Sequence, residues 1–136
     1  MKDSLQPGLS KTRRLVVDAS RTISFMGEEG RVYATPELCW DIENTCREAL
    51  LEHLEAGEDS VGLEIMVRHT APTLPGMTVE ITVTITAVEG RKVSFDAVAR
   101  DDLDQIGEGR HIRFIVDKEK TYARLRAKAA KLVARA

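Results

Sequence analysis

Long apolar runs are missing from this 136-residue chain, and cysteine and aromatic residues are scarce. No segment reaches the roughly 20 apolar residues that a membrane-spanning helix needs. The N-terminal stretch Met1–Gly8 contains no apolar core of the kind found in a signal peptide. We therefore expect a cytoplasmic protein without a membrane partner.

The two cysteines, Cys39 and Cys46, lie in a segment with helical periodicity. Seven residues along one helix separate them by roughly 10 Å, which is too far for a disulfide. Neither has a histidine or another cysteine at metal-ligand spacing. We interpret them as small core residues and expect no metal site.

Neither sign of charge is in large excess, since the net charge is −2. Residues 118–135 are an exception, with a single acid, Glu119, among the basic residues Lys118, Lys120, Arg124, Arg126, Lys128, Lys131 and Arg135. A basic helix can contact the phosphates of a nucleotide or nucleic acid. However, no recognition motif accompanies the charge, and the segment has an ordinary amphipathic stripe of Tyr122, Leu125, Ala129 and Leu132. A solvated basic face is favoured, and no nucleic-acid partner is expected.

The length of the chain fits one domain. Residues 1–14 are polar and predict a flexible N-terminal tail, whereas residues 15–136 are expected to form a single domain. Within that domain, residues 15–25 could supply a first strand.

The strongest helical pattern starts at Thr35, a good N-cap residue. Pro36 suits the first helical position, because its missing N–H would have no partner inside the helix there. The pattern extends to about Ala56 and is expected to stop at Gly57.

Four segments with alternating polarity follow the helix. Strands are expected at 60–70, 77–87, 92–100 and 106–116, and the glycines of the last segment indicate a β-bulge. A second helix covers about 118–135. A long amphipathic helix buries its apolar side when an antiparallel sheet wraps around it. The layout therefore predicts an α+β hotdog fold, with a long central helix wrapped by a curved antiparallel sheet and with a C-terminal helix.

The stretch Val61–Gly76 is the most informative part of the sequence. Leu63, Ile65 and Val67 share one face of the predicted strand, and His69 falls on that apolar face just before a turn with proline and glycine. A histidine in this place needs a buried partner or lines a pocket. A core histidine bonded to a backbone carbonyl is the structural alternative to a functional one.

The long helix has an apolar arc, formed by Leu38, Cys39, Ile42, Cys46, Ala49 and Leu50, and an opposite polar side, formed by Asp41, Asn44, Glu48 and Glu52. Glu43 projects at the edge of the arc. An ion pair with Arg47, four residues on, would explain this position structurally. Alternatively, the Glu43 carboxylate faces the sheet and acts as a base or nucleophile. It follows Thr35 by two helical turns, and the helix start offers free N–H groups suited to an oxyanion.

Several short motifs occur in one order: Val32-Tyr-Ala-Thr35, Glu43 eight positions on, Ser60-Val-Gly62, Arg68-His69-Thr-Ala, Leu74-Pro-Gly76, and Ile106-Gly-Glu-Gly with Arg113 beyond. Through them the chain, over about residues 15–120, resembles the hotdog-fold thioesterases related to fluoroacetyl-CoA thioesterase. The resemblance implies hydrolysis of a short or small acyl-CoA, with Thr35, Glu43 and His69 matching the family's catalytic threonine, glutamate and histidine.

The same resemblance implies a homodimer with the acyl-CoA bound at the subunit interface. It implies no cofactor, since CoA is part of the substrate. It also places Gly62 and Arg113 where the family contacts the acyl end of its ligand, although Gly62 could be a simple strand glycine and Arg113 a surface charge. Whether Glu43 attacks the carbonyl or activates water stays open.

One region departs from the family pattern. The resemblance implies a lid with phenylalanines ahead of Thr35, whereas this chain has a polar, glycine-flanked loop at 26–31 and no phenylalanine after Phe25. Strong selectivity for fluoroacetyl-CoA is therefore not expected. The alternative functions are a non-catalytic acyl-CoA-binding hotdog dimer, acting as a sensor or scaffold, and a hotdog hydratase, which the missing Asp/His pair at the helix start disfavours.

Overall fold

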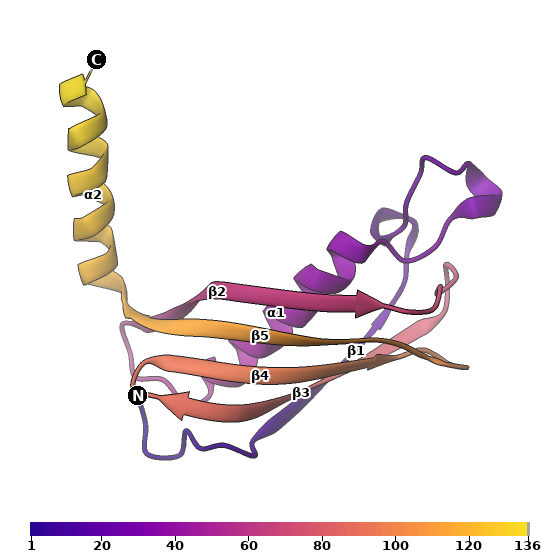
Figure 1. Ribbon diagram of the computed structural model, residues 1–136, viewed down its shortest axis with the longest axis horizontal. Coiled ribbons are helices and arrows are strands. Elements are labelled where there is room, and N and C mark those ends of the chain that lie inside the picture. Colours follow the sequence, from indigo (N-terminus) through magenta and orange to yellow (C-terminus); the bar gives the residue numbers. More distant parts are fainter. Residues whose placement is uncertain (136) are drawn as a thin grey trace.

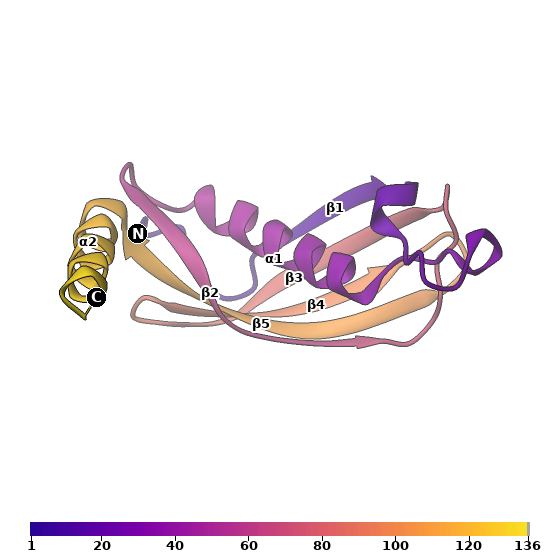
Figure 2. The same cartoon turned by 90° about the horizontal axis from the view of Figure 1, so that it is seen from above.

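A computed structural model describes residues 1–135. Five antiparallel strands form one curved sheet in the order β1-β3-β4-β5-β2 (Figure 1). The strands are β1 Ser10–Val16, β2 Glu58–His69, β3 Thr78–Glu89, β4 Lys92–Arg100 and β5 Gln105–Asp117. The long helix α1, Thr35–Leu51, lies along one face of the sheet, and α2, Lys118–Arg135, leaves the end of β5 (Figure 1 and Figure 2). This is the hotdog arrangement that the sequence predicts.

The core lies between α1 and the concave face of the sheet. Its largest part comes from alternate residues of β3, β4 and β5, namely Val79, Ile81, Val83, Ile85, Val93, Phe95, Ala97, Ala99, Ile106 and Ile115. The helix contributes Leu38, Ile42, Cys46, Ala49 and Leu50. The period-2 pattern of these strands is confirmed, because one face of each packs on α1 and the other is more exposed.

The helix α1 is shorter than predicted. It ends at Leu51 rather than near Ala56, because the chain tightens into a turn in which the N–H of His53 donates to the carbonyl of Leu50. The break at Gly57 follows in a separate turn, where that glycine has a φ of +86°.

The N-terminal part also differs from the prediction. The first strand is Ser10–Val16 and not 15–25, because the side chain of Asp18 accepts the N–H of Arg21 and closes a short 3-10 helix there. The N-terminal residues pack against the domain instead of forming a flexible tail, since the side chain of Leu5 is buried in the core.

The bulge predicted near the glycines of β5 is present, directly before the first of them. Ala99 of β4 pairs with Gly107 and Arg100 pairs with Gln105, which leaves Ile106 of β5 without a partner, whereas Gly107 and Gly109 themselves are paired on both sides. They are glycines because β2 comes very close, so that a Cβ atom on Gly109 would lie 2.6 Å from the carbonyl oxygen of Met66.

A further bulge lies in β2. The pairing of β2 with β5 shifts between Gly62 and Glu64, which leaves Leu63 without a partner residue. One extra residue reverses the alternation of side chains along a strand. Gly62 and His69 are an odd number of residues apart, yet both therefore face α1.

The two edges of the sheet are unlike each other. The edge strand β1 carries Lys11, Arg13 and Arg14, each of them ion-paired with a glutamate. The edge strand β2 exposes four apolar side chains, Val61, Leu63, Ile65 and Met66. Charged edges discourage pairing with another chain and apolar edges invite it. The predicted core strand is therefore an exposed edge.

Candidate active site

The first part of the candidate site lies at the start of α1. Thr35 opens the helix, but its side chain does not cap it as predicted. The Thr35 Oγ1 atom instead lies 2.9 Å from His69 Nδ1 on β2. Pro36 makes a cap less necessary, because proline has no N–H to satisfy. The hydroxyl is thus free to orient the imidazole.

The other ring nitrogen of His69 has no partner. Its Nε2 atom is buried and makes no hydrogen bond within residues 1–135. Burial lowers the pKa of His69 below its usual 6.5, so the imidazole is neutral at pH 7. The structural alternative, a histidine held by a backbone carbonyl, is wrong, since the partner is the Thr35 hydroxyl. A neutral imidazole with one nitrogen fixed and one unoccupied is suited to proton transfer.

A buried polar chain supports this histidine from behind. The ring of Tyr33 meets the ring of His69 edge-on, with 6.0 Å between centroids. The Tyr33 hydroxyl donates to Asp41, and Arg21 Nε donates to the same carboxylate over 3.3 Å. Burial raises the pKa of Tyr33, so that the phenol stays a donor. The predicted outward position of Asp41 is wrong, because these two donors allow its carboxylate to be buried.

The second part of the site surrounds Glu43, which is two turns farther along α1. The ion pair with Arg47, the structural alternative for Glu43, does not form, because Arg47 binds Asp59 through Nε and Nη2 at 2.9 and 2.7 Å. Glu43 is partly buried and forms no hydrogen bond or ion pair with any other residue in the described range 1–135. Its carboxylate is therefore available.

The Glu43 carboxylate faces Gly62 of β2. A Cβ atom placed on Gly62 would lie 3.0 Å from Glu43 Oε1 and 3.4 Å from His111 Cε1. An alanine here would crowd the carboxylate, which would have to shift by a few tenths of an ångström. Gly62 thus leaves room for the close approach of the Glu43 side chain.

Arg113 of β5 lies beside Gly62 and is not the surface charge considered from the sequence, since its side chain is only 6% exposed. Its Nε and Nη2 atoms donate to the hydroxyl and the carbonyl of Ser60, both over 2.7 Å. Its Nη1 atom lies 3.1 Å from His111 Nε2. No carboxylate pairs with Arg113 within residues 1–135, so a buried cation is held by neutral groups alone.

His111 is a site residue that the sequence analysis missed. Its Nδ1 atom lies 2.7 Å from the carbonyl oxygen of Glu64 and must carry the proton. Its Nε2 atom is then the acceptor for Arg113. Burial lowers the pKa of His111, which keeps the ring neutral and able to accept. The available signal was its place two residues before Arg113, on the same face of β5.

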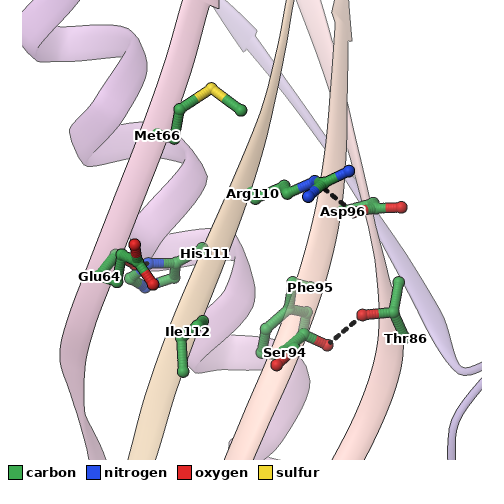
Figure 3. A pocket seen from close by; sticks show the side chains of 9 residues that line it. All are labelled: Glu64, Met66, Thr86, Ser94, Phe95, Asp96, Arg110, His111 and Ile112. Carbon is green, nitrogen blue, oxygen red and sulfur yellow. Dashed lines mark hydrogen bonds and ion pairs between the residues drawn. The ribbon is translucent and has the colours of Figure 1, made fainter.

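A groove of about 400 Å³ opens over the second part of the site. Its lining consists of Trp40, Glu43, Asn44, Arg47, Ser60, Val61, Gly62 and Arg113. A larger hollow of about 570 Å³, shown in Figure 3, lies on the sheet face turned away from α1, where Arg110 and Asp96 approach each other. None of the five predicted site residues lines that hollow, which makes the groove the candidate site.

The structure brings together Thr35 and His69, and separately Glu43, Gly62 and Arg113. It does not join the two parts within one chain. Eight residues of helix between Thr35 and Glu43 correspond to about 12 Å. Within residues 1–135, no group of three or more His, Cys, Asp or Glu side chains is placed to hold a metal ion.

Comparison with known proteins identifies the family. Residues 17–119 match the family described as fluoroacetyl-CoA-specific thioesterase. A fluoroacetyl-CoA thioesterase from Streptantibioticus cattleyicolor is 37% identical over 135 residues, covering 94% of this chain and 97% of the relative.

Solved structures agree. A fluoroacetyl-CoA thioesterase structure superposes with a TM-score of 0.84 at 36% identity, covering 93% of this chain and 98% of that one. A thioesterase superfamily member from Thermus thermophilus gives a TM-score of 0.88 at 30% identity, covering 97% and 98% of the two chains. The chain therefore belongs to the fluoroacetyl-CoA-specific thioesterase family of hotdog proteins and is a thioester hydrolase.

Proposed function

We propose that the protein hydrolyses short acyl-CoA thioesters at the groove beside Glu43. The observation that carries this proposal is the unpaired Glu43 carboxylate, which faces Gly62 across an open groove. The neighbouring guanidinium of Arg113 supplies positive charge for the acyl end or for a developing oxyanion.

The carboxylate has two possible routes to the products. It attacks the thioester carbonyl, the C–S bond breaks, and water then hydrolyses the mixed anhydride. Alternatively, it removes a proton from water that attacks the carbonyl directly. In both routes the proton that the leaving thiolate takes up comes from the hydrolytic water, and the neutral imidazole of His69 relays it by accepting it at Nε2 and passing it on. A burst of free CoA ahead of acid release in rapid-mixing experiments distinguishes the first route from the second.

The two parts of the site meet when two copies pair through β2. An antiparallel pairing about a two-fold axis near the middle of β2 places the partner's His69 close to Gly62 of the first chain, because the strand direction reverses. The exposed apolar residues of β2 support this homodimer, with one active site formed by both chains at each end of the interface.

Mixing two inactive variants tests the shared site. In a mixed dimer of E43Q and H69Q chains, one site carries both substitutions and the other carries none. An equal mixture regains about a quarter of wild-type turnover, because half of the dimers are mixed and each holds one intact site. If each site lies within one chain, no activity returns. Sedimentation as a monomer at micromolar concentration would contradict the dimer itself.

The substrate is tested by measuring thiol release from a panel of short, branched and aromatic acyl-CoAs. We expect turnover of small acyl groups and no strong preference for fluoroacetyl-CoA over acetyl-CoA. Phe25 and Met26 of the loop ahead of Thr35 are 82% and 65% exposed, and they form no dry lid in the single chain. A ratio of kcat/KM above about a thousandfold would show that another element closes the pocket tightly.

A further inference from the structure

The helix α2 is the least explained element of the structure. None of its described residues is buried, and it rises from the end of β5 past the edge strand β2, clear of its own sheet (Figure 1). Its apolar stripe includes Tyr122, Leu125 and Leu132, which are 45%, 60% and 70% exposed. Helices gain most of their stability by packing an apolar face. The single chain offers this face no surface to pack on.

The charge of α2 is also unbalanced. The helix carries seven Lys and Arg side chains and one Glu, a net charge of +6 in a chain of −2, so that residues 1–117 carry −8. No Lys or Arg of α2 forms an ion pair with another residue in the described range 1–135. The complement to this helix is therefore an acidic surface with exposed apolar groups.

The opposite end of the sheet provides such a surface. The turn Asp101–Asp104 joins β4 to β5 there, and Leu103 in its middle is 82% exposed. Leu74, in the neighbouring connection from β2 to β3, is 57% exposed. Asp102 and Asp104 form no ion pair with any residue in the part of the chain that the structure describes. The turn and Leu74 together are called the acidic end below.

Pairing of two copies through β2 brings α2 and the acidic end together. A two-fold axis perpendicular to the sheet exchanges the left and right ends of Figure 1, so that the partner's acidic end lies where α2 rises past β2. Figure 2 shows α2 and the opposite end of the sheet at similar positions along the direction perpendicular to the sheet. A rotation about an axis in that direction keeps these positions, so it does not move α2 and the partner's acidic end apart.

From this placement we infer that α2 is an inter-subunit clasp. Its Tyr122, Leu125 and Leu132 stripe covers the acidic end of a second copy, and Arg124 and Lys128 on one side of the stripe meet the partner's Asp102 and the partner's Asp104. The clasp rests on the β2-paired dimer of the proposed function and adds a second contact to it. An anionic membrane is a poorer match, because the −8 charge of residues 1–117 would be repelled by it.

The clasp also bears on the active site. The acidic end adjoins the end of β2 at which His69 lies, and α2 would cover that end of the partner. The helix therefore supplies a wall to the shared site in which the partner's His69 meets the Glu43 groove of the chain that carries the helix.

Disulfide trapping between two different full-length chains tests the clasp. One chain carries L103C and the other carries Y122C, L125C or L132C in turn. These positions lie at opposite ends of one chain, so a covalent bond joins two chains. We expect an oxidised dimer from at least one of these mixtures. A127C on the far side of the helix is the matched control, and each variant alone controls for the native Cys39 and Cys46.

The outcomes separate the clasp from the dimer. A protein that sediments as a dimer but forms no more cross-link with the stripe positions than with A127C overturns the clasp and leaves the β2 pairing intact. A monomer overturns the dimer as well. Flotation of the uncross-linked wild type with phosphatidylserine vesicles overturns the clasp in favour of a membrane surface.

Charge reversal gives an independent test. R124E together with K128E is expected to raise the dimer dissociation constant by roughly tenfold, because like charges would then face each other. Adding D102R and D104R to the same chain is expected to restore it. If circular dichroism shows that each variant is folded and the rescue still fails, the charge contacts of the clasp are overturned.

Discussion

The two parts of the candidate site have opposite electrostatic designs. The Thr35–His69 pair is neutral, and it leaves one imidazole nitrogen without a partner. The Glu43–Arg113 part contains opposite charges, yet the cation is held by neutral groups and the carboxylate by none. We propose a matching division of labour, in which the neutral end moves protons and the charged end binds the thioester and supplies the carboxylate.

The largest expected effect comes from removing the charge of Glu43. E43Q keeps the shape of the side chain but lowers kcat by about a thousandfold or more, because neither attack nor proton removal is possible for an amide. Thiol release from acetyl-CoA measures the change. E48Q on the exposed side of the same helix is the control and keeps its activity. Near-normal turnover by E43Q would remove the proposed division of labour.

Substitution of His69 tests the neutral end. H69Q is expected to lower kcat by about 10²–10³-fold while changing Tm little, because general acid–base catalysis is lost and the packing is largely kept. Since burial lowers the pKa of His69, the wild-type kcat/KM falls only when the pH drops below 6.5 and the ring gains a proton. A variant that melts early but turns over normally would make His69 a structural residue.

The space at Gly62 gives a sharper test of the charged end. G62A would push the Glu43 carboxylate from its place and lower kcat by roughly 10–100-fold, as small displacements of a reacting group do. In an E43Q background the same substitution is expected to have little further effect, because the two changes act on one group. Full additivity of the two effects would show that Gly62 acts independently of Glu43.

The smallest expected effect concerns His111, which acts through Arg113. Burial lowers the folded-state pKa of His111, so the unfolded chain binds a proton first as the pH falls. Neutral His111 makes its full contribution to the free energy of unfolding above pH 6.5. This contribution is lost below pH 6.5, as the pH falls toward the lowered folded-state pKa of His111. H111Q removes part of the decline of Tm between pH 7 and 5, with a modest rise in KM. An unchanged slope would exclude His111 as the titrating group.

The sequence predicts the fold well because its strongest patterns are local. The alternation in β3 and β4 and the apolar arc of α1 correspond to buried faces in the structure. The position of Asp41 could not be predicted, since it depends on Tyr33 and Arg21, which come from the segment before the helix. The same holds for Arg47, whose partner Asp59 lies on β2.

The family resemblance supplies the candidate site residues, whereas the sequence does not predict their partners. Pairing of the Thr35 hydroxyl with His69 requires the helix start and the end of β2 to meet, which no helical or strand periodicity shows. The spacing of His111 from Arg113 was its one signal in the sequence, and its contacts with Arg113 and with the carbonyl of Glu64 depend on how the strands pair. Long-range contacts of this kind follow from topology and not from local pattern.

The unpaired Leu63 has a consequence for how β2 tolerates change. The side chains of β2 alternate between the two faces of the sheet, and this alternation is reversed at Leu63. Upstream of Leu63 the positions that face α1, such as Ser60 and Gly62, are even-numbered, and downstream they are odd-numbered. Regular pairing of Leu63 with β5 would remove the bulge and turn either Gly62 or His69 to the outer face, whereas deleting Leu63 would remove the bulge and keep both on the α1 side. The bulge at one unpaired residue thus decides whether both parts of the site exist on the same side of the sheet.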